Sequence, residues 1–285
     1  MKTVFWFIQV RKEQVNMETN IIELATTRES WLAFLNEKRV KQHLSRQEER
    51  QIRDFIDRQG YLPLCEACRE GVFPCSLPVK RTINKEGSSK KRVVYTFSGD
   101  EGIFLKFIAH GLSMYEERLP DSCYAFRSRV GAREATLRLR RDRRVENSWC
   151  LKADISNYFN SIDVALLLPR LAILQERNPE VYRLLARLLL EERVLEEGQQ
   201  IRESHGVMAG TPISPFLANL YLTEVDRFFE EKGVLYLRYS DDMLLFAGSR
   251  EELLRRQEQL YGQLTALGLS VNQDKVSVTG PGEPF

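Results

Sequence analysis

Two adjacent carboxylates, Asp241 and Asp242, lie in the segment Tyr239–Asp242 between two short apolar runs. The runs Val234–Leu237 and Met243–Ala247 predict the two strands of a hairpin that carries the carboxylates at its tip. Aspartate is depleted in strands, and neighbouring like charges repel each other unless something neutralises them. A divalent metal ion is the simplest neutraliser, so this segment predicts metal chemistry.

A third carboxylate, Asp154, lies at the end of the predicted strand Leu151–Ile155, just before a loop. If this strand end lies beside the hairpin tip, the three carboxylates can hold two Mg²⁺ ions about 4 Å apart. One ion lowers the pKa of an attacking hydroxyl and the other stabilises the leaving oxygen, as nucleotidyl transfer requires. The alternative is structural: Asp154 would cap a helix, and the adjacent carboxylates would form an ordinary turn.

Basic residues are concentrated in two segments, although the net charge of the 285-residue chain is only +2. Residues 78–94 hold six Lys or Arg against one Glu, and residues 127–144 hold eight Arg against one Glu and one Asp. Such clusters predict a phosphate-rich partner, while a solvated helix face is the alternative for either segment alone. The 43% hydrophobic content is sufficient for one large or two modest domains.

Composition argues against a secreted or membrane protein. Five cysteines in a chain of this length do not predict a disulfide scaffold, and we interpret them as reduced residues of a cytoplasmic protein rather than zinc ligands. No apolar run is long enough to span a membrane, and no cleavage site follows the short run Val4–Val10. Met17 is an alternative start, which would make residues 1–16 an upstream extension.

Helical spacing of apolar residues predicts helices over residues 20–60. Residues 61–150 are predicted to be mixed, with a strand at Val93–Phe97, a helix over about 101–118, and a turn at Gly87–Ser89 in a basic hairpin.

The remaining residues, 151–285, alternate predicted strands and helices. Besides the carboxylate hairpin, the predicted strands are Leu151–Ile155, Leu269–Val271 and Lys275–Val278, and Glu191–Glu203 is predicted to be a polar loop. The predicted helices are Val164–Leu174, Val181–Leu190, a helix opened by Thr211 and Pro212, and a helix begun by a capping box of Ser249 and Glu252. This order favours an α+β fold, an antiparallel ferredoxin-like sheet backed by helices.

Six segments in a fixed order resemble the motifs of reverse transcriptases, and the resemblance covers nearly all of residues 60–285. The segments are KKRVVYTF (Lys90–Phe97) and YAFRSR (Tyr124–Arg129) for the fingers, LKADISNYFNSID (Leu151–Asp163) for motif A, GVMAGTPISPFLANLYL (Gly206–Leu222) for motif B, RYSDDMLLF (Arg238–Phe246) for motif C and LGLSVNQDK (Leu267–Lys275) for motif D. A lone Asp-Asp pair would be a weak signal, whereas six motifs in the family's order are highly specific.

The resemblance implies the fingers and palm of a right-hand polymerase. It divides the chain into an extension over residues 1–20, N-terminal helices and fingers over 21–150, and a palm over 151–285 with helical finger elements around 163–205. The chain ends about where the family's primer-grip hairpin and thumb would begin, so we expect the thumb to be absent.

The resemblance also implies roles for the site residues. Asp154 and Asp241 would be the principal ligands of two Mg²⁺ ions, with Mn²⁺ as a substitute, while Asp242 positions metal or primer and the Ile155 carbonyl joins the metal shell. The implied nucleotide-binding residues are Lys90, Arg92, Ile155, Ser156, Asn157, Tyr158, Phe159, Gly210 and Lys275.

Each implied nucleotide contact has a physical reason. Lys90 and Arg92 would neutralise the triphosphate, and the N–H groups after Asp154 would cradle it. Phe159 would exclude a ribose 2′-OH and so select dNTPs, with core packing as its alternative role. Gly210 would let the backbone approach the template or nucleotide closely. Lys275 would protonate pyrophosphate, and its alternative role is that of an ordinary surface lysine.

Motif B departs from the family's usual pattern. It contains Met208, Ala209 and Gly210 where the group II intron and retroviral branches commonly have Pro-Gln-Gly, so the Gln that would meet the nucleotide is missing. The motifs look most like bacterial unknown-group and abortive-infection reverse transcriptases, which are associated with antiphage defence.

We therefore expect an RNA-directed DNA polymerase that uses dNTPs and a structured RNA as template and primer. The alternatives are a template-independent or DNA-copying polymerase of the same fold, and a non-catalytic RNA-binding scaffold. We expect no membrane partner, and the formation of a homo-oligomer is left open.

Overall fold

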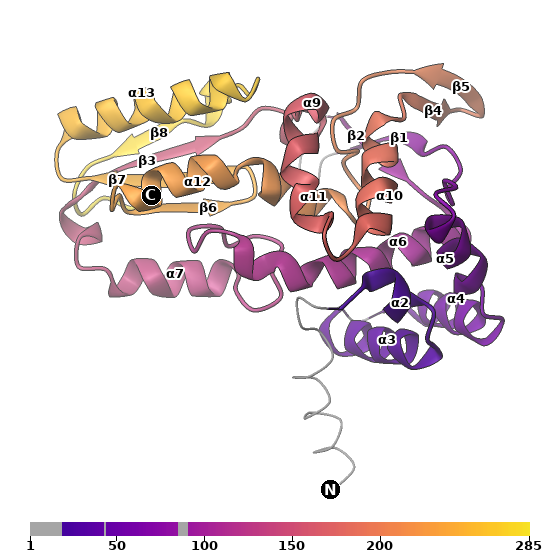
Figure 1. The fold of residues 1–285 in the computed structure, drawn as a ribbon. Coiled ribbons are helices and arrows are strands. Elements are labelled where there is room, and N and C mark those ends of the chain that lie inside the picture. The colour runs from indigo at the N-terminus through magenta and orange to yellow at the C-terminus, as the bar shows by residue number, and fades with distance from the viewer. Residues whose placement is uncertain (1–18, 43, 85–90) are drawn as a thin grey trace, which may run out of the picture. The chain divides into compact units, whose positions relative to one another are not determined.

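The structure is a computed structural model that describes residues 19–42, 44–84 and 91–285 (Figure 1). The chain divides into two compact units. The first unit comprises the residues up to Tyr115 together with 171–204 and 208–213, and the second comprises 116–170, 205–207 and 214–285. The predicted turn at Gly87–Ser89 and nearly all of the predicted extension over 1–20 lie outside the described residues, and the domain boundary at residue 150 stays a prediction.

The first unit has a helical part whose core is aromatic. Trp31 and Phe107 are buried and stack with their ring centroids 4.2 Å apart. Buried Asn178 joins distant segments, since its Oδ1 accepts from the Ile21 N–H at 2.6 Å and its Nδ2 donates to the Tyr115 hydroxyl at 2.8 Å. The helices are α2 (Ile21–Ala25), α3 (Arg28–Gln42), α4 (Arg46–Asp57), α5 (Tyr61–Arg69), α6 (Gly99–Leu112) and α10 (Pro179–Leu190), so the helices predicted over 20–60 are confirmed.

Four strands form the sheet of the first unit in the order β2-β1-β4-β5. Strand β1 (Val79–Asn84) pairs antiparallel with β2 (Lys91–Thr96) and parallel with β4 (Arg193–Glu196), which forms a hairpin with β5 (Gln199–Arg202). The strand predicted at Val93–Phe97 is thus confirmed within β2. Lys80 and Arg81 of the first basic segment therefore lie on β1, and Lys91 and Arg92 lie on β2.

The prediction of a polar loop over Glu191–Glu203 is wrong, because this segment contains β4 and β5. Glu197 and Gly198 supply the two positive φ angles, +51° and +80°, of a tight two-residue turn. The glutamates that suggested a loop have a partner across the sheet, since Lys80 Nζ lies 3.3 Å from Glu196 Oε1 and 2.6 Å from Glu203 Oε2. Pairing with a lysine therefore accounts for Glu196 of β4 and for Glu203, which directly follows β5.

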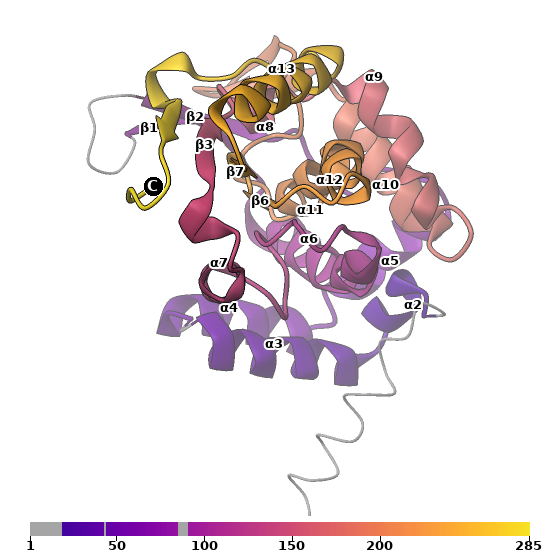
Figure 2. The same ribbon diagram turned by 90° about the vertical axis from the view of Figure 1, so that its left-hand side faces the viewer.

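The second unit is built on an antiparallel sheet in the order β6-β7-β3-β8. Its strands are β3 (Trp149–Asp154), β6 (Tyr236–Tyr239), β7 (Asp242–Ala247) and β8 (Ser277–Thr279). Helix α13 (Arg250–Ala266) and helix α7 (Ala132–Arg141) lie on opposite sides of β3 and β7, as Figures 1 and 2 both show. On the α7 side, Ala135 and Leu139 pack against a buried cluster that includes Leu237 and Phe246. This arrangement confirms the predicted α+β sheet backed by helices.

Several helix and strand boundaries differ from the predictions. The helix predicted over about 101–118 is α6 followed by a 3-10 helix at Ser113–Arg118, and the helix predicted at Val164–Leu174 is α9 (Val164–Leu167) followed by a 3-10 helix. Ser249 caps α13 as predicted, but Glu252 accepts from the N–H of Gly248 and not from that of Ser249. Of the last two predicted strands, one is a single bridge from Val271 to Ile155 and the other is the short β8.

The helix predicted to open at Thr211 begins instead at Ser214 and is divided into α11 (Ser214–Tyr221) and α12 (Thr223–Glu231). The Thr223 hydroxyl donates to the Asn219 carbonyl at 3.2 Å. Threonine bonds of this kind to a carbonyl one turn earlier bend helices, which explains the division. Among the described residues, no helix is both long enough and apolar enough to cross a membrane.

Candidate active site

The two adjacent carboxylates lie at a tight turn between β6 and β7. Tyr239 pairs with Asp242, so the loop between the strands contains only Ser240 and Asp241. Ser240 has φ +62°, a left-handed conformation that few residues other than glycine adopt. The backbone therefore presents Asp241 at the end of the sheet on a sharply defined turn.

Strand β3 brings the third carboxylate to the same end of the sheet. Asp154 is directly opposite Asp242 in the register of β3 and β7, and the Ile155 N–H donates to the Asp241 carbonyl at 3.2 Å. Side chains of directly opposite residues share one face of an antiparallel pair. Asp154 is 4% exposed, whereas Asp242 lies at the exposed margin. The structure thus brings the three predicted carboxylates together.

Mutual repulsion is evident in the electrostatics of this group. Partial burial, followed by the negative charges of Asp241 and Asp154, raises the pKa of Asp242. Lys275 provides the opposite charge, with its Nζ 2.7 Å from Asp154 Oδ2, and this hydrogen bond raises the pKa of Lys275. Asn272 completes the contacts of Asp154 by donating to Oδ1 at 3.2 Å.

These carboxylates fit a divalent cation in their chemistry, because clustered oxygen donors that repel one another are what Mg²⁺ neutralises. Within the described parts of the chain, no three His, Cys, Asp or Glu residues are arranged to hold a metal ion. The Lys275 ammonium group is the positive charge that lies beside Asp154 in this structure. The predicted two-ion site therefore stays a prediction.

The segment after Asp154 turns sharply into the short helix α8 (Tyr158–Ser161). Asn157 has φ +46°, and its carbonyl accepts from the N–H groups of Asn160 and Ser161. The Ser156 N–H is already used by the Ser270 carbonyl at 2.9 Å, so it is not available to cradle a triphosphate in this conformation. Tyr158 is buried, and its hydroxyl donates to the Ala218 carbonyl at 2.5 Å, which leaves only its backbone for a nucleotide contact.

Phe159 is half-buried and its backbone is tightly held. Its carbonyl accepts from the Val207 N–H at 2.9 Å, and a Cβ on Gly206 would lie only 2.3 Å from the same carbonyl oxygen. Gly206, with φ +56°, is therefore required for close packing behind Phe159. Sequence reasoning had singled out Gly210 and missed Gly206, which stands at the start of motif B.

The other predicted nucleotide-binding residues belong to the first unit. Lys90 lies outside the described residues, and Arg92 is in β2 opposite Ile83. Gly210 has φ +97°, and a Cβ there would lie 3.0 Å from the Cβ of Val94, so this glycine is needed where motif B packs on β2. Their contacts with a nucleotide stay predictions.

A buried ion pair behind the turn was not predicted. Arg238 and Asp226 are both 0% exposed, and Arg238 Nη2 donates to Asp226 Oδ2 at 2.6 Å. Arg238 Nη1 also donates to the Ser240 carbonyl and to Asn219 Oδ1, each at 3.1 Å. The ion pair thus supports the turn that carries Asp241. Arg238 had been noted only as the first residue of a motif.

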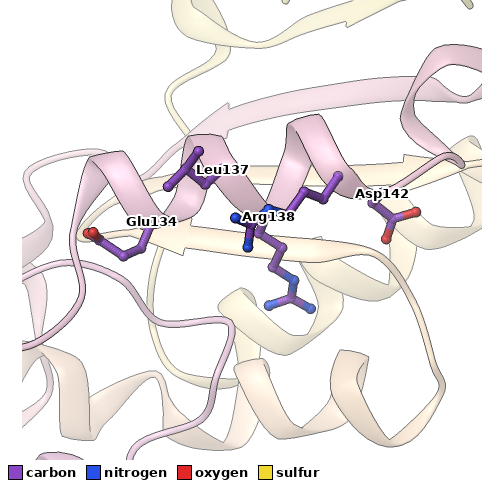
Figure 3. A pocket seen from close by; sticks show the side chains of 5 residues that line it. Glu134, Leu137, Arg138 and Asp142 are labelled. Atoms are coloured by element: carbon purple, nitrogen blue, oxygen red, sulfur yellow. The ribbon is translucent and has the colours of Figure 1, made fainter.

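Half of the eight arginines of the second basic segment lie on α7, namely Arg133, Arg138, Arg140 and Arg141. Figure 3 shows Glu134, Leu137 and Arg138 on this helix and Asp142 just after its end. With Arg141 they line a pocket of about 450 Å³. A second pocket, of about 540 Å³, lies between α7 and the sheet and includes Arg140, Lys152 and Asp242 in its lining. Basic side chains therefore reach the margin of the carboxylate group within the second unit.

Comparisons with known proteins point to one family. A family model described as reverse transcriptase (RNA-dependent DNA polymerase) matches residues 83–282. Retron Ec86 reverse transcriptase of Escherichia coli is 33% identical over 76 residues, 25% of this chain and 24% of that protein. Protein YkfC of Escherichia coli (strain K12) is 23% identical over 172 residues, 48% of this chain and 45% of that protein. The chain thus spans about a quarter and just under half of the lengths of these two relatives.

The fold has a likeness among solved structures. A structure of apo telomerase from Candida tropicalis, truncated from the C-terminal domain, superposes with a TM-score of 0.56 over 73% of this chain and 50% of that chain. At 14% identity the likeness concerns the fold alone. Together with the family match, it confirms the predicted class, an α+β fingers-and-palm fold.

Proposed function

The chain belongs to the reverse transcriptase family, and from this premise we propose that it is a Mg²⁺-dependent RNA-directed DNA polymerase. The observation that carries the proposal is the register that places Asp154 opposite Asp242, with Asp241 on the turn beside them. Three like charges at one strand end cost free energy unless a cation compensates them. A polymerase needs these carboxylates to bind metal ions, which gives a reason for the fold to keep them despite this cost.

Asp154, Asp241 and Asp242 would hold the divalent ions, with the Ile155 carbonyl as a further ligand. When bound, the ions supply a lowered pKa for the primer 3′-hydroxyl and charge stabilisation for the leaving oxygen. Lys275 would hold a proton at Nζ beside Asp154 and donate it to the departing pyrophosphate, a role that its raised pKa supports.

Nucleotide selection is proposed for Phe159. Its fixed backbone would keep the ring against the sugar, so that a 2′-OH is excluded and dNTPs are preferred. The N–H groups of Asn157, Tyr158 and Phe159 lie at the N-terminus of α8 and would donate hydrogen bonds to phosphate oxygens. Arg92 and Lys90 would add positive charge to the triphosphate.

RNA would bind through the arginines on and after α7, because closely spaced Arg side chains suit phosphate oxygens. We propose a structured RNA as template and primer, a cytoplasmic location and a role in bacterial antiphage defence, which the motifs of the sequence support.

The alternatives are a polymerase that copies DNA or needs no template, and a scaffold that binds RNA without catalysis. The ion pair between Lys275 and Asp154 is compatible with the scaffold, in which it would serve only the stability of the fold. Primer extension with Mg²⁺ on RNA templates, on DNA templates and without template separates these functions.

The decisive variant is Asp241→Ala. Primer extension on RNA should be about a hundred- to a thousandfold slower in this variant than in the parent, because a group that positions the reacting atoms is lost. Asp121→Ala, at an exposed aspartate of the second unit, is the matched control and should leave extension unchanged. Equal activity of Asp241→Ala and the parent would refute the assignment.

A further inference from the structure

Phe126 adopts a backbone conformation that bulky residues rarely adopt. Its φ is +58°, in the left-handed region, and its side chain is 48% exposed. A non-glycine residue stays there only where the surrounding structure imposes the conformation, and such strained positions concentrate at functional sites. An exposed phenylalanine held in this way therefore calls for an explanation beyond simple packing.

The segments on both sides of Phe126 are fixed by hydrogen bonds. Before it, Asn219 Nδ2 donates to the Ala125 carbonyl at 2.8 Å. After it, Arg127 Nη1 donates to the carbonyls of Pro120 and Cys123, both at 2.9 Å. These bonds fix the residues on both sides of Phe126 and so hold its backbone in the left-handed conformation.

The same network reaches the turn that carries the carboxylates. Asn219 accepts from Arg238 Nη1 at 3.1 Å, and the same nitrogen donates to the Ser240 carbonyl at 3.1 Å. Asn219 therefore links the segment of Phe126 to the turn before Asp241. The position of Phe126 is thus coupled to the position of the reacting groups and not to a surface loop.

The ring of Phe126 packs edge to face against the ring of Phe159. Their centroids are 6.2 Å apart and their planes are inclined by 79°. We propose that Phe126 is a second specificity-determining residue, which fixes the orientation of the Phe159 ring against the sugar of the incoming nucleotide. The inference rests on the proposed polymerase function and extends it to a residue outside motif A.

Without Phe126, the Phe159 ring keeps one aromatic neighbour, Tyr158 at 5.6 Å, and can turn to other rotamers, while its backbone stays fixed by Val207 and Gly206. A turned ring leaves room for a 2′-OH. Aromatic pairs of this geometry contribute an amount equivalent to about a two- to tenfold change in an equilibrium. Discrimination against ribonucleotides should fall by that factor when the Phe126 ring is removed.

The test measures kcat/KM for dNTP and rNTP incorporation on one RNA template, in the parent, Phe126→Ala, Phe159→Ala and the double variant. The ratio of the two constants should fall about two- to tenfold in Phe126→Ala. The double variant should discriminate no worse than Phe159→Ala, because Phe126 acts through that ring. Phe228→Ala is the control, since it removes one ring of another edge-to-face pair, Phe228 with Phe229 on α12.

Thermal unfolding of Phe126→Gly checks the strain independently of activity. Glycine adopts positive φ at no steric cost, so Phe126→Gly should melt at a higher temperature than Phe126→Ala. If the parent extends primers but the ratio is unchanged in Phe126→Ala, the inference is overturned and the proposed function still stands. Equal melting temperatures of the two variants overturn the strained support, and a parent without polymerase activity overturns both proposals.

Discussion

Removing one partner of the Arg238–Asp226 pair should be among the most destabilising single changes in the second unit. Asp226→Ala leaves a guanidinium group that is 0% exposed without its counter-ion. The change also removes three hydrogen bonds from Arg238, at 2.8, 3.1 and 2.6 Å, and one from the Tyr236 hydroxyl at 3.0 Å. An uncompensated buried charge of this kind costs about 3–5 kcal/mol of unfolding free energy.

Urea unfolding followed by far-UV circular dichroism measures this cost. The matched control is Asp57→Ala, which breaks the exposed ion pair with Arg28. In this pair the Arg28 side chain is 50% exposed and the Asp57 side chain is 65% exposed. That change should cost less than about 1 kcal/mol. A double variant, Arg238→Met with Asp226→Leu, should recover much of the loss because no charge is left buried. A cost of Asp226→Ala no greater than that of Asp57→Ala would refute the reasoning.

Three further predictions concern charge and backbone. Hydrogen bonds from Arg144 lower the pKa of Asp142 to about 2. These bonds therefore stabilise the folded protein at any pH above the pKa that Asp142 has in the unfolded chain, and this stabilisation is lost as the pH falls toward 2. Asp142→Asn should therefore cost up to about 1 kcal/mol at pH 7 and nothing below pH 2, measured by urea unfolding across pH. Lys275→Met removes an ammonium group that competes for a buried carboxylate, so Mn²⁺ should bind about tenfold more tightly by calorimetry, while nucleotide addition becomes slower. Gly206→Ala should lower the free energy of unfolding by roughly 1–3 kcal/mol, whereas Gly262→Ala, with open space around it, should be neutral or slightly stabilising.

The carboxylate turn could be predicted because its signals are local. Apolar runs on both sides of Asp241 and Asp242 predict the hairpin, and Asp154 ends a strand that the same reasoning identifies. The cap that Ser249 forms and the helices of the first unit are likewise predicted by short sequence patterns. For such features, neighbouring residues decide the structure.

Features that depend on distant partners could not be predicted. Glu196 of β4 and Glu203, directly after β5, make this segment look like a polar loop, but both pair with Lys80, which lies over a hundred residues earlier in the chain. The burial of Arg238 depends on Asp226 in another element, and an arginine in the sequence gives no sign that it will be fully enclosed. The positive φ of Phe126 contradicts local preference, so only tertiary contacts can impose it.

The interleaving of the two units has a consequence for biosynthesis. Strand β1 needs β4 as its neighbour, and the first unit also includes residues 208–213, so it cannot be completed until about three quarters of the 285-residue chain has left the ribosome. Helices α3 and α4, by contrast, are neighbours in the sequence and contact each other, so this pair can form early. Until β4 is available, the pair of strands β1 and β2 would have an unpaired edge. Nascent chains at such a stage are prone to aggregation and depend most on chaperones.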